Sequence, residues 1–104
     1  MSVLMELSIF PTDKGESVSE YVCEVIKMIR EHKLNYQTTA MGTIIETENI
    51  DEALAIIKEA NEILLGKNCN RIYCVAKFDI RIGKTNRLKG KVNSIKEKIG
   101  DINC

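Results

Sequence analysis

The sequence has no tryptophan, only one histidine and one proline, and no surplus of charge of either sign. Fifteen lysines and arginines balance fifteen aspartates and glutamates. Nucleic-acid-binding domains usually carry an excess of basic residues on one face, and this chain has none overall. With 5% aromatic residues, it also lacks the stacking platforms on which RNA-binding sheets depend. The composition therefore gives no support for a nucleic-acid partner.

Long apolar runs and paired cysteines are missing as well. No stretch approaches the roughly 20 apolar residues that span a bilayer, and the N-terminal MSVLMELSIF has no basic leader or cleavage site. Cys23, Cys69, Cys74 and Cys104 form no C-x-x-C pair, and His32 is not grouped with any of them. No metal site is expected from such spacing. We therefore expect a cytoplasmic protein with reduced thiols and no membrane partner.

The residues that are present predict a single domain over 1–104, because 44% apolar content in 104 residues suffices for one core. Alternation of apolar residues predicts strands, and apolar residues at helical spacing predict helices. The predicted strands are residues 2–10, the two arms of a hairpin over 36–47, and 72–81. The predicted helices are residues 17–33, 49–66 and 88–99.

The order of these elements is typical of an α+β fold. Two helices interleaved with four strands predict a ferredoxin-like βαββαβ sandwich, in which helices cover one face of an antiparallel sheet, with an additional C-terminal helix. Ser17 and Glu20 have the spacing of a capping box for the first helix. Asn49 or Asp51 can cap the second. The glycine in TTAMGTIIE, Gly42, can serve a hairpin turn through a positive φ or permit a close backbone approach.

The sheet face away from the helices carries a mixed set of side chains. Its apolar members are Leu4, Phe10, Tyr73 and Val75. A patch of this kind favours burial by a second copy, which predicts a sheet-to-sheet oligomer. The polar members of the same face are Glu6, Ser8, Lys77, Asp79 and Arg81. They allow two interpretations: cross-strand ion pairs on a solvated face, each contributing roughly 0.2–1 kcal/mol, or the polar lining of a ligand site.

Catalytic patterns are not evident. The single histidine, His32, lies near a predicted helix end and forms no recognisable dyad with a serine or cysteine. The segment RIGKTNRLKGK contains G-K-T but lacks the upstream glycine of a phosphate-binding loop. We therefore expect no enzymatic activity and no cofactor.

Three blocks of the sequence resemble the small thiamine-binding protein family: MELSIFPTDKGESVSEYV, TTAMGTIIE and DIRIGKTNRLKGKVNSIKEKIG. They occur in the same order as in that family, and the resemblance covers essentially the whole chain. It implies a ferredoxin-like fold and dimers that associate into tetramers through their sheets. It also implies binding of thiamine or its hydroxymethylpyrimidine half, without known chemistry.

The resemblance, together with the phase of the strands, gives a hypothetical ligand site. Glu6 or Glu46, with Asp79, would supply negative charge to the thiazolium cation. Arg81 fits poorly beside a cation, so it would hold Asp79 in place or meet a phosphorylated form of the ligand.

The uncharged part of the hypothetical site would bind the rings. Hydroxyls that could hydrogen-bond the pyrimidine are those of Ser8, Thr39 and Thr43. Phe10 or Met41 would pack against a ring, and Gly42 would let the backbone approach closely.

The expected function is non-catalytic binding of thiamine or its hydroxymethylpyrimidine moiety in the cytoplasm, for vitamin supply, storage or salvage. The alternative is a regulatory or protein-interaction module of ferredoxin-like fold whose pocket is incidental. A further alternative is an enzyme that acts on a phosphorylated thiamine precursor.

Overall fold

The chain folds into one four-stranded sheet and three helices, described here from a computed structural model of residues 1–104. The elements are β1 (Ser2–Pro11), α1 (Ser19–Glu31), β2 (Asn35–Thr39), β3 (Gly42–Thr47), α2 (Ile50–Gly66), β4 (Ile72–Arg81) and α3 (Arg87–Ile99). The strands are antiparallel and stand in the order β2-β3-β1-β4. Element order and strand order are those of the split βαβ arrangement, as predicted, with α3 added.

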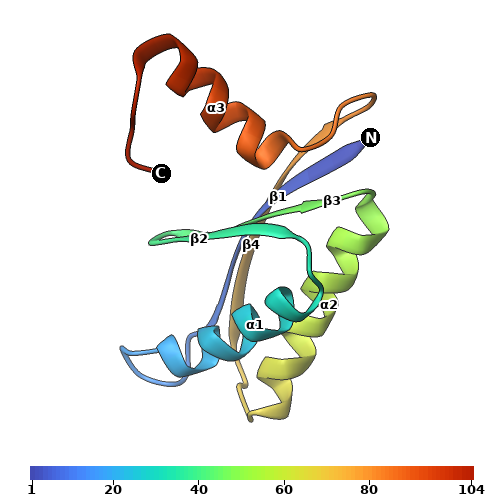
Figure 1. The fold of residues 1–104 in the computed structure, drawn as a ribbon. Helices are drawn as coiled ribbons and strands as arrows, with labels where there is room; N and C mark the ends of the chain where they lie inside the picture. Colours follow the sequence, from blue (N-terminus) through green and yellow to red (C-terminus); the bar gives the residue numbers. More distant parts are fainter.

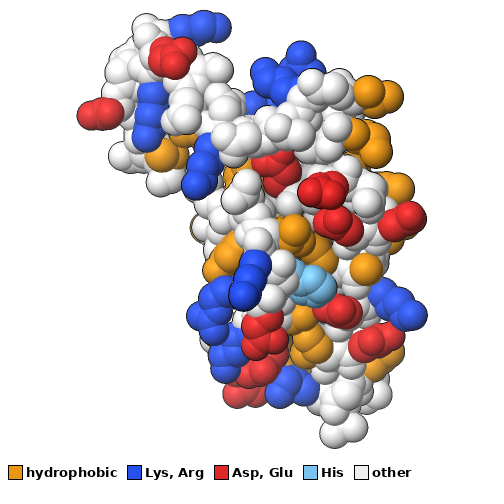
Figure 2. Space-filling view, turned by 45° about the vertical axis from the view of Figure 1, so that its right-hand side comes forward, with side chains coloured by type: hydrophobic (Ala, Val, Ile, Leu, Met, Phe, Trp, Pro, Cys, Tyr) orange, Lys and Arg blue, Asp and Glu red, His pale blue; other side chains and the backbone are white.

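The helices lie on different sides of the sheet. α1 and α2 pack side by side against one face, whereas the first turn of α3 contacts the other face at β3 and β1, and the rest of this helix extends away from there (Figure 1). None of the three helices is long and apolar enough to cross a membrane. Acidic and basic side chains are interspersed over the surface seen in Figure 2, as the balanced composition leads one to expect.

The predicted alternation of the strands is confirmed by their register. The inward row of β1, Val3, Met5, Leu7 and Ile9, is buried in a core that α1, α2 and β3 complete. Each of these residues lies opposite a residue of β4 on the same face; the four opposite residues are Ile80, Phe78, Ala76 and Cys74. The sequence therefore predicts correctly which side chains of the two strands share a face.

The helices nevertheless leave β4 uncovered. Phe78 and Ile80 belong to the helix-side face, yet 39% and 53% of their surfaces are exposed. On the other face Tyr73 and Val75 are exposed as well. β4 is also an edge strand, with β1 as its only partner. It therefore presents apolar side chains on both faces beside an unpaired row of backbone groups.

The first helix begins later than the sequence predicts. The predicted capping box of Ser17 and Glu20 does not form: α1 starts at Ser19, its N-cap residue is Val18, and no side chain caps the helix. The preceding loop is instead tied to the α2–β4 connection, where Asp13 accepts a 2.8 Å hydrogen bond from the Asn70 N–H. This tether and the positive φ of Gly15 belong to the loop that precedes Val18. For α2, the predicted cap is confirmed, since the Asn49 side chain accepts from the Glu52 N–H at 2.9 Å.

Candidate functional site

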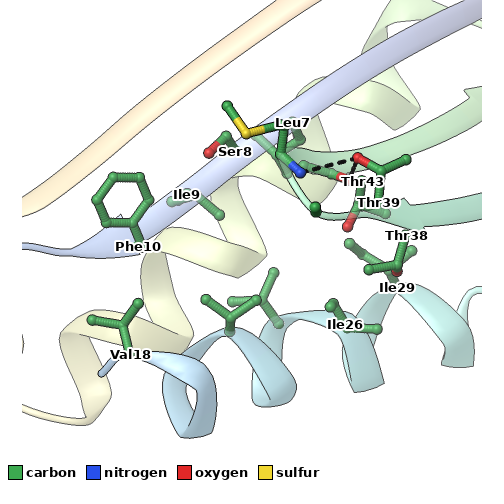
Figure 3. Close-up of a pocket in the computed structure, with 15 residues that line it drawn as sticks. Leu7, Ser8, Ile9, Phe10, Val18, Ile26, Ile29, Thr38, Thr39 and Thr43 are labelled. Carbon is green, nitrogen blue, oxygen red and sulfur yellow. Dashed lines mark hydrogen bonds between the residues drawn. The ribbon is translucent and has the colours of Figure 1, made fainter. Parts of the chain in front are cut away.

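A pocket of about 330 Å³ lies between α1, the C-terminal half of β1 and the tip of the β2–β3 hairpin (Figure 3). Ten of its fifteen lining residues are hydrophobic. The lining residues are Leu7, Ser8, Ile9, Phe10, Val18, Val22, Val25, Ile26, Ile29, Thr38, Thr39, Ala40, Met41, Gly42 and Thr43. No carboxylate, amine, guanidinium, imidazole, phenol or thiol is among them, so its polar side chains are hydroxyls only.

The pocket exists because the hairpin is shorter than the strand beside it. β1 pairs with β4 as far as Pro11, but its pairing with β3 ends at Leu7 and Thr43. Beyond Leu7 the space that a longer β3 would occupy is open. The apolar side of α1 forms its floor, and the hairpin tip forms one wall (Figure 3).

Thr39 fixes the shape of the hairpin tip. Its hydroxyl donates to the Gly42 carbonyl at 2.8 Å and accepts from the Met41 N–H at 3.2 Å, the two contacts drawn as dashed lines in Figure 3. One lone pair of the hydroxyl then remains for another donor. Thr39 therefore shapes the wall of the pocket in addition to lining it.

Gly42 is required by close packing and not by the turn. The prediction of a positive φ at this glycine is wrong, because only Gly15, Gly83 and Gly100 have one. An ideal Cβ at Gly42 would instead lie 2.9 Å from the Leu7 carbonyl oxygen. Gly42 thus lets β3 begin directly against β1, as the close-approach hypothesis supposes.

The structure brings six of the predicted site residues to this pocket: Ser8, Phe10, Thr39, Met41, Gly42 and Thr43. Thr43 is buried, and Met41 is exposed at the tip. Phe10 also contacts Tyr73 of β4, with ring centroids 5.7 Å apart. The sequence did not identify the α1 side of the pocket as part of the site, although its helical spacing had assigned those residues to one apolar face.

Glu6 and Arg81 lie outside the pocket. Glu6 forms a 2.9 Å ion pair with Lys77, which lies directly opposite it on β4. This confirms, for that pair, the interpretation of cross-strand ion pairs on the open face, which is the face of the sheet away from α1 and α2. Arg81 lies opposite Ser2, at the far end of β4 from the pocket.

Asp79 and Glu46 hold α3 on the open face of the sheet. The Glu46 carboxylate accepts from the N–H groups of Arg87 and Leu88 at 3.0 and 3.1 Å, and so caps α3. No side chain at the N-cap residue itself does so. Asp79 pairs with Arg87 at 3.1 Å and with Lys91 at 2.6 Å, so these residues, and not Arg81, hold it.

Arg87 is the residue at the centre of this cluster, and the sequence analysis missed it. Only 2% of its surface is exposed. Its guanidinium donates to the hydroxyl and the carbonyl of Ser2, both at 2.8 Å, and to Asp79. The one signal in the sequence is its place in the first turn of a helix, where the helix dipole disfavours a cation.

The Glu46 carboxyl makes the attachment of α3 dependent on pH. Burial raises the pKa of this carboxyl. Hydrogen bonds from the Arg87 and Leu88 amides and from Ser2, together with the Arg87 charge, lower the pKa by more than burial raises it, so the net pKa lies below the usual value. A group with a depressed pKa stabilises the fold above its unfolded pKa, and this contribution is lost as pH falls through the folded pKa.

We therefore expect Glu46→Gln to lower the free energy of unfolding by about 1–2 kcal/mol at neutral pH, and by progressively less below about pH 4. Urea unfolding of both proteins between about pH 7 and pH 3 measures this difference. Glu6→Gln is the control, because its partner is an exposed lysine. A difference for Glu46→Gln that stays constant over the whole range would contradict the assignment.

Fold and pocket together define a small α+β domain with an uncharged, hydroxyl-bearing cavity of small-ligand size at the end of its central strand. Residues 5–96 match the family model described as thiamine-binding protein. The chain belongs to this thiamine-binding protein family.

Several known proteins are similar over nearly the full chain. The UPF0045 protein MJ1052 of Methanocaldococcus jannaschii is 38% identical over 95 residues, which cover 91% of this chain and 93% of the relative. A UPF0045 protein of Methanothermobacter thermautotrophicus is 33% identical over 98 residues, 93% of this chain and 99% of the relative.

Solved structures share the fold. The crystal structure of MJ1052 superposes with a TM-score of 0.79 at 37% identity and covers 92% of this chain and 97% of its own. A Thermotoga maritima protein, described as a candidate thiamine biosynthesis/salvage protein, has a TM-score of 0.77 at 19% identity, with 91% and 99% of the two chains covered. At that identity the second likeness shows the fold alone.

Proposed function

We propose that this protein binds thiamine or its hydroxymethylpyrimidine half in the cytoplasm, without chemical turnover, for vitamin supply, storage or salvage. The observation that carries the proposal is the pocket at the end of β1, which gathers six residues of the hypothetical thiamine site. Membership of the thiamine-binding family supports the ligand class. The Thermotoga maritima protein, described in terms of thiamine biosynthesis or salvage, has the same fold.

The lining of the pocket favours the pyrimidine half of the vitamin. A cavity of about 330 Å³ is at the small end of ligand sites. Burying the thiazolium cation there would leave it without a counter-charge, which is costly. The neutral aminopyrimidine pays no such penalty, and the Thr43 side chain, which lies opposite Leu7 on the helix side of the sheet, offers it a hydroxyl in the lining.

The thiazolium ring would then lie at the mouth of the pocket. Phe10 lines the pocket and packs against Tyr73, which is exposed on the outer side. The face of an aromatic ring attracts a cation by about 0.5–1 kcal/mol at an exposed site. In this arrangement the two aromatic rings provide the favourable contact that the sequence analysis had assigned to carboxylates.

The charged candidates of the sequence analysis have other tasks in this proposal. Asp79 lies opposite Leu4, which is four residues before Ser8 and so about 13 Å away along β1. Glu46 is occupied by the first turn of α3. We therefore assign ligand contacts to the uncharged residues, and assign the carboxylates to the sheet and to α3.

We also propose that the protein is a homo-oligomer, either a dimer or a tetramer, whose chains associate through their sheets. Tyr73 and Val75 on the open face and Phe78 and Ile80 on the helix-side face are all exposed around the edge strand β4. A monomer rarely exposes a long apolar edge strand without charges, prolines or bulges that prevent its pairing with another chain. The same surface favours the alternative function, a protein-interaction module, which would keep its activity when the pocket is altered.

Isothermal titration calorimetry tests the proposed function. We expect the wild-type protein to bind one hydroxymethylpyrimidine per chain, and the thiazole half alone to give no saturable heat. Thr43→Val removes a buried hydroxyl with little change of shape, and should weaken pyrimidine binding about 10-fold. Phe10→Ala should weaken thiamine more than the pyrimidine, since the cation loses its aromatic contact.

Asp79→Asn is the matched control, because Asp79 is exposed to solvent at the other end of β1. Its affinity should remain within about 2-fold of wild type, whereas its stability should fall. The proposal fails if the wild-type protein binds neither ligand. If the wild type binds but only Asp79→Asn loses affinity, the ligand lies on the open face and the pocket assignment is wrong.

A further inference from the structure

The backbone of β1 has a free edge inside the pocket. β3 ends its pairing with β1 at Leu7, while β4 continues to Pro11 on the other side. The segment from Ser8 to Pro11 therefore has a strand partner on one side only. Any backbone group there that points away from β4 needs another partner or stays unpaired.

Alternation along the strand identifies which groups these are. In an antiparallel sheet the N–H and C=O of one residue point to the same side, and successive residues alternate. The Thr12 N–H donates to the Arg71 carbonyl at 2.8 Å, toward β4. Residues with even numbers therefore face β4 and those with odd numbers face the other way. The position of the Leu7 carbonyl is consistent with this alternation, because this odd-numbered residue directs its carbonyl toward Gly42 of β3 and away from β4.

Ile9 is thus the first residue whose N–H and C=O both face the vacant side. None of the hydrogen bonds outside the helices and strands involves Ile9. The next odd residue, Pro11, has no N–H to offer. Met41 would lie opposite Ile9 if the hairpin continued, but its N–H is held by the Thr39 hydroxyl at 3.2 Å. Thr39 therefore keeps the hairpin from pairing with Ile9.

The unpaired groups lie in a shielded place. Ile9 lines the pocket and only 7% of its surface is exposed. A buried donor and acceptor without partners are unfavourable, and structures rarely retain them without a reason. Extended backbone edges commonly bind ligands by offering them the place of a missing strand.

We propose that the main chain of Ile9 is the group that recognises the aminopyrimidine ring; this inference rests on the proposed function. The Ile9 N–H donates to a ring nitrogen, and the Ile9 carbonyl accepts from the adjacent exocyclic amino group. The donor and the acceptor on one edge of the ring take the place of the N–H and C=O that an opposite residue of β3 would have supplied. The side chains around the pocket then select the ring by shape, whereas the backbone selects its hydrogen-bonding pattern.

This arrangement predicts a specificity. An analogue with an oxo group in place of the amino group carries its proton on the ring nitrogen, so donor and acceptor exchange places along the edge. It could satisfy Ile9 only by turning over, which would move the hydroxymethyl and methyl groups to each other's positions. Wild-type protein should therefore bind the oxo analogue at least about 10-fold more weakly than the amino compound.

Replacing a single amide by an ester tests the role of Ile9 without changing any side chain. Native Cys23 permits ligation of a synthetic peptide 1–22 to a fragment 23–104, so the full natural chain can be assembled around the change. An ester at Ile9 removes the N–H that faces the pocket. The control is an ester at Leu4, an even residue whose N–H faces β4, far from the pocket.

We expect the Ile9 ester to bind hydroxymethylpyrimidine about 10-fold more weakly than the ligated all-amide chain, with little change in melting temperature. The Leu4 ester should melt at a lower temperature and keep the affinity of the all-amide chain. Equal affinity in all three chains would overturn the role of Ile9 and leave the proposed function standing. Failure of the all-amide chain to bind would refute the proposed function, and with it the role of Ile9.

Discussion

Arg87→Ala is expected to lower the free energy of unfolding by about 3 kcal/mol. Arg87 is buried, and its guanidinium joins Ser2 at the start of β1 to Asp79 near the end of β4. Its removal leaves the Ser2 carbonyl and hydroxyl without this partner and empties a large buried volume. The first turn of α3, which Glu46 caps, should then detach from the sheet. Urea unfolding at neutral pH measures the loss.

The matched control is Lys91→Ala, which removes the other cation beside Asp79. Lys91 forms a shorter ion pair, at 2.6 Å, but both partners are more than half exposed. Exposed pairs contribute at most about 1 kcal/mol, so this variant should unfold at nearly the wild-type urea concentration. An equal decrease in the free energy of unfolding for the two variants would contradict the claim that the buried Arg87 stabilises the fold more than the exposed Lys91. Pyrimidine affinity should be unchanged in both, because neither residue lines the pocket.

Gly42→Ala is the second change with a large expected effect, and it should reduce stability and ligand binding together. The added methyl group would lie 2.9 Å from the Leu7 carbonyl oxygen, a backbone atom that can move only with β1. We expect a loss of about 2 kcal/mol of stability. Separation of the hairpin from β1 would also displace Thr39 and Thr43, so pyrimidine affinity should fall about 10-fold or more.

Gly90→Ala is the control for that substitution. Gly90 lies within α3, and no atom comes within 4 Å of a Cβ placed there. Alanine is the better helix former, so this variant should be more stable than wild type by up to about 1 kcal/mol. Thermal unfolding and calorimetric titration of the two alanine variants separate the effects. Wild-type affinity in Gly42→Ala would show that the hairpin tip takes no part in binding.

Most of the fold could be predicted because periodicity carries the information. The alternation in β1 and β4 gives the faces of the strands, and the apolar stripes of α1 and α2 give the surfaces that cover one of them. Local chemistry was reliable where a side chain caps its own helix, as Asn49 does. It failed for α1, which no side chain caps, and whose preceding loop is tied at Asp13 to Asn70, a residue far away in sequence.

The site was predicted in part, for a related reason. Strand phase places Glu6 and Ser8 on one face but does not tell where β3 stops, and the pocket begins at that point. Similarly, no periodicity reveals that α3 turns back onto the open face and occupies Glu46 and Asp79. Glu46 and Asp79, whose contacts depend on where α3 packs, were therefore assigned to the ligand and not to α3. The threonines near the hairpin were correctly expected to lie together.

The unpaired edge of β1 connects the fold to the proposed function. Because the β2–β3 hairpin stops short of Ile9, the protein has an uncharged cavity with a backbone donor and acceptor on one wall. Thr39 maintains this state by holding the Met41 N–H within the turn. A hairpin longer by one pair would occupy this space, so the length of β3 is a determinant of the proposed binding site.

Titration of ¹⁵N-labelled protein with hydroxymethylpyrimidine, followed by amide chemical shifts, tests the central claim most directly. The account predicts saturable shifts at Ile9, at Phe10 and along residues 38–43 and the facing side of α1, with the largest change at the Ile9 amide. The amide chemical shifts of Lys77, Asp79 and Arg87 should not change. Shifts confined to the open face around Lys77 and Asp79, or no saturable shift anywhere, would contradict the account.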